Sequence, residues 1–379
     1  MPKNEKEHEP MNLVTMVNAM LTLDKLLTSS KVRQTHLKKQ GRRDPETDSF
    51  IIQTQLLKDY VAERVAKFLH GHPAYYWFSR IKGVGDENIA KVVGLLDIHK
   101  AGPGKTQTTI SSFWMYAGMA TGEDGHAMKR VKGEKLRYNN TLRSMCWRLG
   151  SALKRAGLRQ KCEACGNLFG STEKDGTDRE NCPKCGGKKF GIVATSKFGQ
   201  AYLDVKAAYE ARFDREGIKV LPTPPGNWGC INCGASFAKK TDIGECCADQ
   251  HIERTLKEEP AGVIWKGHLE NMAMRKVIKI FLGCLWLVWA EKVGVPVRPP
   301  YAVEKLGHSS TISPWDMVDR PEKVKKKKKE EEEEEEEETI EDNVFAHINA
   351  AELLPGNRMA LTFDVDYLKS IGQWPIIMP

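Results

Sequence analysis

The feature that most constrains the fold is the spacing Cys162-x2-Cys165-x16-Cys182-x2-Cys185. Each Cys-x2-Cys pair forms a tight turn that presents two thiolates together, and four thiolates complete a tetrahedral zinc shell with no position left for water. A site of this kind is structural, because so short a segment folds when it binds the metal. We therefore predict a zinc ribbon at residues 161–190.

A second cysteine cluster begins with Cys230-x2-Cys233, and its other half offers Cys246, Cys247 and His251. We predict that Cys230, Cys233, Cys247 and His251 bind a second structural zinc ion, because Cys247 and His251 lie four residues apart and would share one face of a helix. The alternative shell is Cys230, Cys233 and Cys246 with either Cys247 or His251. Cys146 and Cys284 lie in apolar helical contexts and are expected in the core.

The cysteines also bear on the compartment. Eight of the ten fall in the two clusters, and the N-terminal "MPKNEKEHEP" has no secretory signal. Zinc in a reducing compartment is therefore favoured over disulfides. The longest apolar stretch, residues 280–290, is too short to span a bilayer. We expect a cytoplasmic protein without membrane contact.

Most of the chain is expected to be helical. Apolar residues recur at helical spacing over residues 11–28 and again from Ile52 to Leu69, with a basic polar connection at 31–49. These two stripes predict an N-terminal helical hairpin or coiled-coil arm. Residues 266–293 predict the most hydrophobic helix of the chain, with Lys276 and Lys279 on one side.

The charge is unevenly distributed. The net charge is +8; the Lys/Glu run at 325–338 contributes −4 and the tail after it −3, which leaves about +15 on residues 1–324. Between Lys129 and Lys161 the chain has eleven basic residues and one acidic residue, Glu134. Such a balance is typical of a protein that binds a polyanion. Since Tyr and Asn side chains are mixed with these basic residues, we predict nucleic-acid contact here.

A glycine turn at residues 83–85 precedes a helix with an acidic first turn. Such a turn exposes N–H groups near the positive end of a helix and can hold a backbone phosphate, although it can equally serve only to pack two helices. We predict nucleic-acid contact at Lys82, Gly83, Gly85, Lys129, Arg130, Lys132, Lys135, Arg137, Tyr138, Asn139 and Arg143.

Three stretches carry a family resemblance: "IKGVGDENIAKVVGLLDI", "TISSFWMYAGMA" and "RVKGEKLRYNNTLR". Over residues 75–160 they resemble the C-terminal helix-hairpin-helix domain of bridge-RNA-guided insertion-sequence transposases. Segments 198–215 and 264–310 resemble a wider transposase-like group, in which the zinc modules would be insertions. The family's RuvC-like domain and nucleophilic serine have no counterpart here, since residues 120–143 contain no serine and too few residues precede the match.

What remains resembles the Nop domain of archaeal box C/D ribonucleoproteins and the Nop-like Tas proteins of TIGR-Tas systems. This resemblance implies a mainly α fold, a helical Nop-like or helix-hairpin-helix domain with an N-terminal hairpin and two inserted zinc modules. It implies a guide-RNA-binding protein of a mobile-element or phage system in a prokaryotic or phage-infected cell, without its own nuclease. The expected partners are guide RNA, target DNA, a second copy of the chain and a separate nuclease.

Two other functions stay open. One is an enzyme, a diverged recombinase or HNH-like nuclease that uses Asp249, His251 and Asn271. The other is a structural protein that binds DNA of any sequence.

The domain organisation that we predict has eight parts. They are an N-terminal hairpin at 1–73, the Nop-like domain at 74–160, the zinc ribbon at 161–190, a helical continuation at 191–225, the second zinc module at 226–256, a C-terminal helical segment at 257–320, a Lys/Glu-rich linker at 321–343 and a tail at 344–379.

Overall fold

The structure of the chain is a computed structural model in which most of the first 320 residues can be described. It describes residues 12–99, 109–122, 126–128, 133, 136–172, 179–224, 227–230, 236–237, 252–255, 258–297 and 312–320. For the strands at 227–230, 236–237 and 252–255 only the backbone is described.

The described residues are mainly helical, which confirms the predicted fold class at this level. The helices are α1 (Leu13–Lys39), α2 (Pro45–His70), α3 (Tyr75–Phe78), α4 (Asp86–Val93), α5 (Ile110–Tyr116), α6 (Asn140–Gly157), α7 (Lys197–Arg215), α8 (Lys266–Val293) and the 3-10 helix η3 (Pro314–Met317). The strands are β1 (Leu158–Cys162), β2 (Leu168–Phe169), β3 (Phe190–Ala194), β4 (Lys219–Leu221), β5 (Asn227–Cys230), β6 (Ser236–Phe237), β7 (Ile252–Thr255) and β8 (Val263–Trp265).

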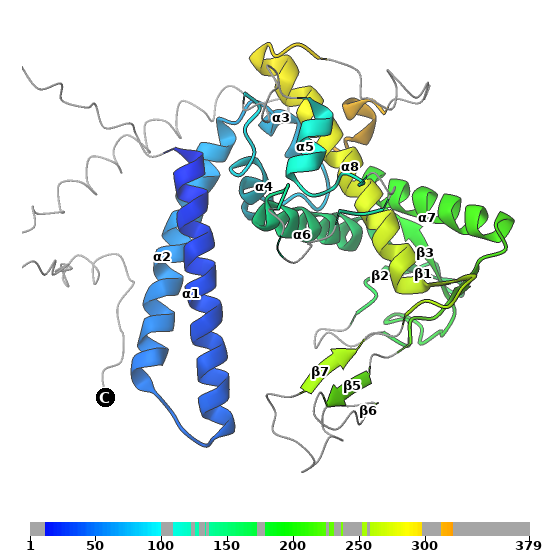
Figure 1. Ribbon diagram of the computed structural model, residues 1–379, viewed down its shortest axis with the longest axis horizontal. Helices are drawn as coiled ribbons and strands as arrows, with labels where there is room; N and C mark the ends of the chain where they lie inside the picture. Colours follow the sequence, from blue (N-terminus) through cyan, green and yellow to red (C-terminus); the bar gives the residue numbers. More distant parts are fainter. Residues whose placement is uncertain are drawn as a thin grey trace, which may run out of the picture. The chain divides into compact units, whose positions relative to one another are not determined.

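The helices α1 and α2 form the predicted hairpin and run side by side (Figure 1). The α1 helix begins where the side chain of Asn12 accepts a hydrogen bond from the Thr15 amide. The predicted connection at 31–49 is wrong, because α1 continues to Lys39 and α2 already starts at Pro45. The last turns of α1 are rich in polar residues that favour helix but give no apolar stripe, so periodicity alone does not reveal them.

The core lies around α8, which is buried over most of its length between α5, α6 and α7 (Figure 1). Its central residues from Phe281 to Trp286 are all buried, and the non-glycine residues among them are at most 3% exposed. The predicted helix at 266–293 is thus confirmed with both of its ends. Its apolar residues lie on all sides, which is typical of a helix that other helices surround. Cys146 and Cys284 are buried in this core, as predicted.

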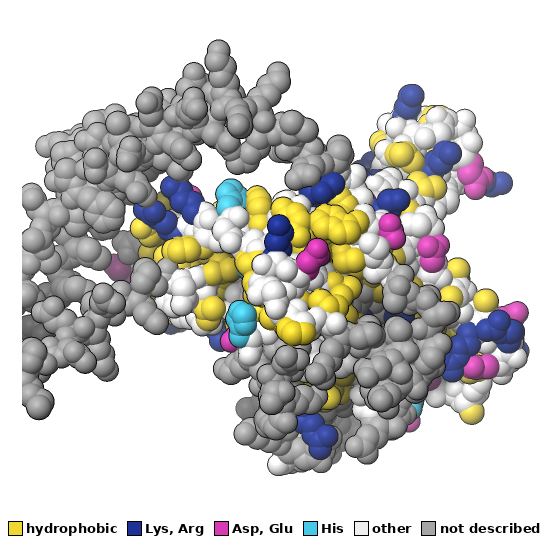
Figure 2. All heavy atoms as spheres, turned by 90° about the horizontal axis from the view of Figure 1, so that it is seen from above, with side chains coloured by type: hydrophobic (Ala, Val, Ile, Leu, Met, Phe, Trp, Pro, Cys, Tyr) yellow, Lys and Arg dark blue, Asp and Glu magenta, His cyan; other side chains and the backbone are white. Residues whose placement is uncertain are grey.

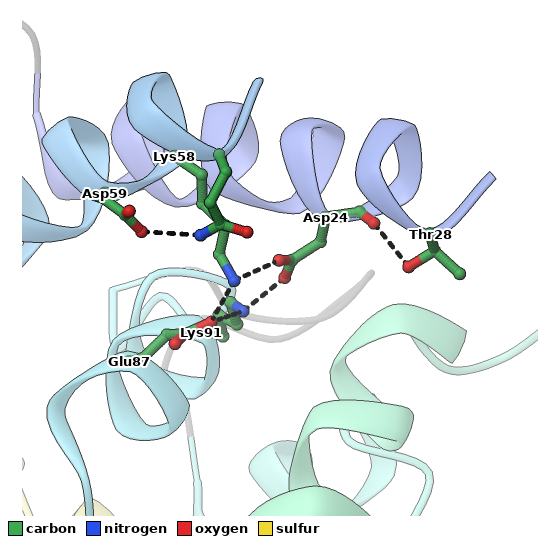
Figure 3. A network of polar contacts seen from close by, with 7 residues as sticks. Asp24, Thr28, Lys58, Asp59, Glu87 and Lys91 are labelled. Carbon is green, nitrogen blue, oxygen red and sulfur yellow. Dashed lines mark hydrogen bonds and ion pairs between the residues drawn. The ribbon is translucent and has the colours of Figure 1, made fainter. Parts of the chain in front are cut away.

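A polar network joins the hairpin to α4 (Figure 3). The ammonium group of Lys91, a residue only 2% exposed, contacts Glu87 at 2.6 Å and also the carboxylate of Asp24 on α1. Lys58 on α2 contacts Asp24 at 2.9 Å. Burial alone would raise the pKa of Asp24, but hydrogen bonds from Lys91 and Lys58 outweigh it and lower that pKa. The network therefore fixes three helices by paired charge.

The strands form three small sheets. The strands β2, β1 and β3 make an antiparallel sheet in that order, β4 and β8 pair in parallel, and β5 lies between β6 and β7. The first sheet coincides with the predicted zinc ribbon, and the third with the predicted second module. Because β4 and β8 pair directly, the residues between them form an insertion into the helical chain.

Candidate metal centre and nucleic-acid interface

The four cysteines of the first cluster come together at one end of the β1–β2–β3 sheet. Their sulfur atoms all lie within 4.8 Å of one another, with Cys162 and Cys185 at 3.6 Å and Cys165 and Cys182 at 3.6 Å. Zinc–sulfur bonds of about 2.3 Å in a tetrahedron place sulfurs about 3.8 Å apart. The arrangement could therefore hold a metal ion and is compatible with zinc.

The two Cys-x2-Cys turns have the same backbone geometry. Gly166 donates its amide to the Cys162 carbonyl at 2.9 Å, and Gly186 donates to the Cys182 carbonyl at 2.9 Å. Both glycines have positive φ, of 69° and 71°, a conformation that a residue with a Cβ rarely adopts. This repetition explains why a glycine follows each pair.

The electrostatics of the cluster favour a thiolate. Burial opposes ionisation of Cys182, but N–H groups of Lys184 and Cys185 and hydrogen bonds from neighbouring thiols outweigh it and lower the pKa of this thiol to about 6. The Gly187 N–H would lower the pKa of Cys185, but the neighbouring thiols raise it to about 12, so without a metal ion the negative charge is concentrated on Cys182. Thiolate is the form that binds metal. With four sulfur ligands the shell is closed, so the centre would stabilise the ribbon and perform no chemistry.

The side chains of the second cysteine cluster lie outside the described part of the structure. Cys230 ends β5, where only the backbone is described, and Cys233, Cys246, Cys247 and His251 lie outside the described residues. The second zinc site therefore stays a prediction.

The glycine turn packs closely against α6. Gly83 has φ 92°, and a Cβ there would lie 2.8 Å from the Cβ of Ala156 and 2.9 Å from the carbonyl oxygen of Ala152. Gly85 has open space around the same position and forms the N-cap of α4. Of the two glycines, Gly83 is thus required for helix packing, and only Gly85 is open to a ligand.

Lys82 already has partners inside the protein. Its amide donates to the carboxylate of Asp319 at 2.7 Å, and its ammonium group donates to the Thr195 hydroxyl at 2.9 Å. The same carboxylate accepts from the amide of Lys197 at the start of α7. Asp319 thus occupies the Lys82 amide, which directly precedes the turn, and phosphate binding at residues 83–85 stays a prediction.

The described part of the basic segment supports α6. Asn139 caps the helix by accepting from the Leu142 amide at 3.0 Å. The Tyr138 ring is buried, with the guanidinium of Arg143 5.0 Å from its centre, and Arg143 also donates to the Met128 carbonyl at 2.9 Å. Arg137 is exposed. Lys129, Arg130, Lys132 and Lys135 lie outside the described residues.

Beside this segment lies a group of four basic residues, Arg143 on α6 with Arg275, Lys276 and Lys279 on α8, which we name the cation cluster. Arg275 donates to the carbonyl oxygens of Gly118 and Ala120, the latter at 2.6 Å. Lys279 lies 4.5 Å from the centre of the Trp114 ring. Two members of the cluster, Arg275 and Lys279, therefore contact α5 and the chain that leads from it towards the basic segment.

No carboxylate among the described residues forms an ion pair with the cation cluster; the neighbouring acid on α8, Glu270, is bonded to Lys154 and Lys206. Burial, Lys276 and Arg275 together lower the pKa of Lys279 to about 8. Burial and Arg143 likewise lower the pKa of Arg275. The cluster is a place where an anion would relieve repulsion between like charges.

Arg275 was not among the site residues predicted from the sequence, and Lys276 and Lys279 were predicted only as one side of a helix. The signal was present, since "RKVIK" at 275–279 stands in a stretch without an acidic residue from Asn271 to Ala290. Asn271, a candidate of the nuclease hypothesis, is an exposed residue of α8, while Asp249 and His251 lie outside the described residues.

Comparison of the chain with family models, curated proteins and solved structures gives no match. Within the described residues, no helix combines the length and the apolar composition needed to cross a membrane.

Proposed function

We propose that the chain binds nucleic acid through the cation cluster and the basic segment beside it, and that the ligand is a structured RNA of the guide type. The observation that carries the proposal is the cluster itself. Burial, with Lys276 and Arg275 nearby, lowers the pKa of Lys279, and burial, with Arg143 nearby, lowers the pKa of Arg275; no carboxylate of the described residues forms an ion pair with these side chains. A phosphate backbone supplies the negative charge that such a surface lacks.

The position of the cluster supports this reading. Arg143 bonds the carbonyl of Met128, the last described residue before Lys129 and Arg130. The described residue that directly precedes the basic segment is therefore in contact with the cluster. Together the segment and the cluster would form one positive surface, along which phosphate contacts set the affinity.

RNA is preferred to duplex DNA on the family resemblance of residues 75–160. In this proposal the chain holds a guide RNA, target DNA pairs with that RNA, and a separate nuclease cleaves. A protein that grips duplex DNA of any sequence is the second candidate, because a cluster of cations alone does not distinguish the two backbones.

We also propose that the protein acts as a homodimer through α2. Three residues at four-residue steps on this helix are largely exposed: Ile52 at 56%, Leu56 at 61% and Tyr60 at 54%. Phe50 and Leu57 are also exposed, on an adjoining side of the same helix. A second copy of the hairpin would cover this apolar stripe.

The experiment compares binding of a structured RNA and of duplex DNA over a range of salt concentrations. Lys276→Ala is the informative variant, because the Lys276 side chain is exposed and the fold does not depend on it. We expect weaker RNA binding and a salt slope lower by about one. Lys25→Ala, which removes an exposed lysine of α1, serves as the matched control and should bind like the wild type. Equal binding by the wild type and Lys276→Ala would contradict the proposed interface.

A further inference from the structure

A second basic and aromatic surface lies at the other end of α8. It consists of Tyr76 on α3, Trp315 on η3, Arg80 and Lys292, and we name it the stacking platform. Lys292 follows Lys276 by sixteen residues, which corresponds to about 24 Å along the helix and about 160° around it. The platform is therefore separate from the cation cluster.

In the platform, two rings in contact with each other lie between two cations. The Lys292 ammonium lies 4.8 Å from the centre of the Tyr76 ring, the Tyr76 and Trp315 rings are 5.6 Å apart, and the Arg80 guanidinium lies 6.0 Å from the Trp315 ring. Seen from above, Lys and Arg side chains lie among hydrophobic ones on the upper face, not in one block (Figure 2). Such a mixture is suited to a ligand with both flat and charged parts.

The segment that carries Trp315 is firmly attached. The indole N–H of Trp77 donates to the Pro314 carbonyl at 2.8 Å, and the amides of Asp319 and Arg320 both donate to the Arg80 carbonyl. Met317 is buried. The segment is thus fixed on both sides of η3 and cannot simply turn its tryptophan inward.

Trp315 nevertheless stays 45% exposed. A large ring held rigidly at the surface loses little conformational entropy when a ligand stacks on it. Two carboxylates, Glu291 and Asp316, adjoin the platform in sequence, so its net charge is smaller than that of the cation cluster. Stacking, rather than charge, would therefore dominate binding there.

We propose that the stacking platform binds an unpaired nucleobase of the bound nucleic acid, on the exposed part of the Trp315 ring, with Arg80 and Lys292 beside the adjoining phosphates. This inference rests on the proposed nucleic-acid function. A proline-rich peptide is the other ligand that exposed aromatic rings accept, but two flanking cations favour a ligand that carries phosphate.

The test uses the full chain with three probes: oligo(U), oligo(dT) and a fully paired RNA hairpin. We expect Trp315→Ala to weaken binding of the unpaired probes by roughly 5- to 100-fold. Binding of the paired hairpin and the salt slope should stay unchanged. Trp315→Phe should restore most of the affinity, whereas Ile312→Ala, an exposed apolar residue of the same segment, should behave like the wild type. A preference for oligo(U) over oligo(dT) would identify the source as RNA, and the reverse as DNA.

The possible results distinguish failure of this inference from failure of the proposed function on which it rests. If the wild type binds the unpaired probes and Trp315→Ala binds them equally well, the platform is refuted while the proposed function stands. If the wild type binds no probe, the proposed function fails first. Saturable binding of a proline-rich peptide that Trp315→Ala abolishes, with unchanged binding of the unpaired probes, would also overturn the inference.

Discussion

At the residue scale, the two glycines of the turn separate packing from ligand access. Gly83 combines positive φ with contacts of 2.8 and 2.9 Å at the position of a Cβ, while Gly85 has neither constraint. We expect Gly83→Ala to lower the free energy of unfolding by about 2–4 kcal/mol. Gly85→Ala should cost about 1 kcal/mol or less. Denaturant titration of both variants measures this difference, and equal losses would show that the turn does not pack as described.

Also at this scale, Lys91 makes stability depend on pH. Its bonds help to lower the pKa of Asp24 and Glu87 below their ordinary values of 3.8 and 4.5, although burial alone would raise both. Groups with a lowered folded-state pKa stabilise the protein above the ordinary values, and this stabilisation is lost as the pH falls through the folded-state values.

The variant Lys91→Met should therefore be less stable than the wild type by about 2–3 kcal/mol at neutral pH. The difference should begin to shrink as the pH falls below the ordinary values of 4.5 and 3.8, and it should be smallest below the lowered folded-state values, where the carboxylates are protonated in both proteins. Denaturation midpoints between pH 7 and pH 3 give the comparison. Lys25→Met removes an exposed lysine next to Asp24 in the sequence and is the control; a similar loss in that variant would argue against the network.

At the scale of elements, the sequence predicts a helix or a small module best where the local residue pattern is compatible with few structures. The α8 helix and the clustering of the four cysteines beside the β1–β2–β3 sheet were predictable, because the helix is apolar on all sides and the cysteines have a fixed spacing. The hairpin was predictable in kind but not in length. The apolar stripe that was predicted on α2 also has a buried part and an exposed part: Val61, Val65 and Leu69 are buried, whereas Ile52 and Leu56 are exposed. Which half of a stripe meets the core depends on the neighbouring helices, which periodicity does not encode.

The cation cluster shows what sequence could not reveal. Arg143 and Arg275 are far apart in the chain and are brought together only by packing of α6 against α8. Conversely, Tyr138 and Asn139 lie in a strongly basic segment, yet their side chains support a buried ring contact and a helix cap. Composition locates a positive region but does not say which of its residues are used internally.

The ribbon should depend on metal as an element. Cys182→Ser should lower the zinc content by one equivalent and unfold the ribbon, while the helical core keeps its structure; a chelator that removes all zinc should unfold the ribbon as well. Metal analysis, the thiolate charge-transfer band of the cobalt-substituted protein and hydrogen exchange of the ribbon amides report the change. The control is Cys146→Ala, a buried cysteine outside the cluster, which should retain the metal. Full metal content in Cys182→Ser would rule out the predicted shell.

At the scale of the whole molecule, the exposed stripe of α2 predicts self-association. Leu56→Glu places a charge in the centre of this face and should shift the protein from dimer to monomer in sedimentation experiments, without loss of helix content. Leu26→Glu, a matched change at an isolated exposed leucine of α1, should leave the dimer intact. A monomeric wild type would contradict the proposed assembly.

The central claim is that this chain holds a guide-type RNA. The most direct measurement is to purify the full chain from its native host and to sequence the nucleic acid that accompanies it. We expect RNA of one discrete size, reduced in amount for Lys276→Ala. Protein recovered free of nucleic acid, or carrying duplex DNA of mixed sequence, would contradict guide-RNA binding.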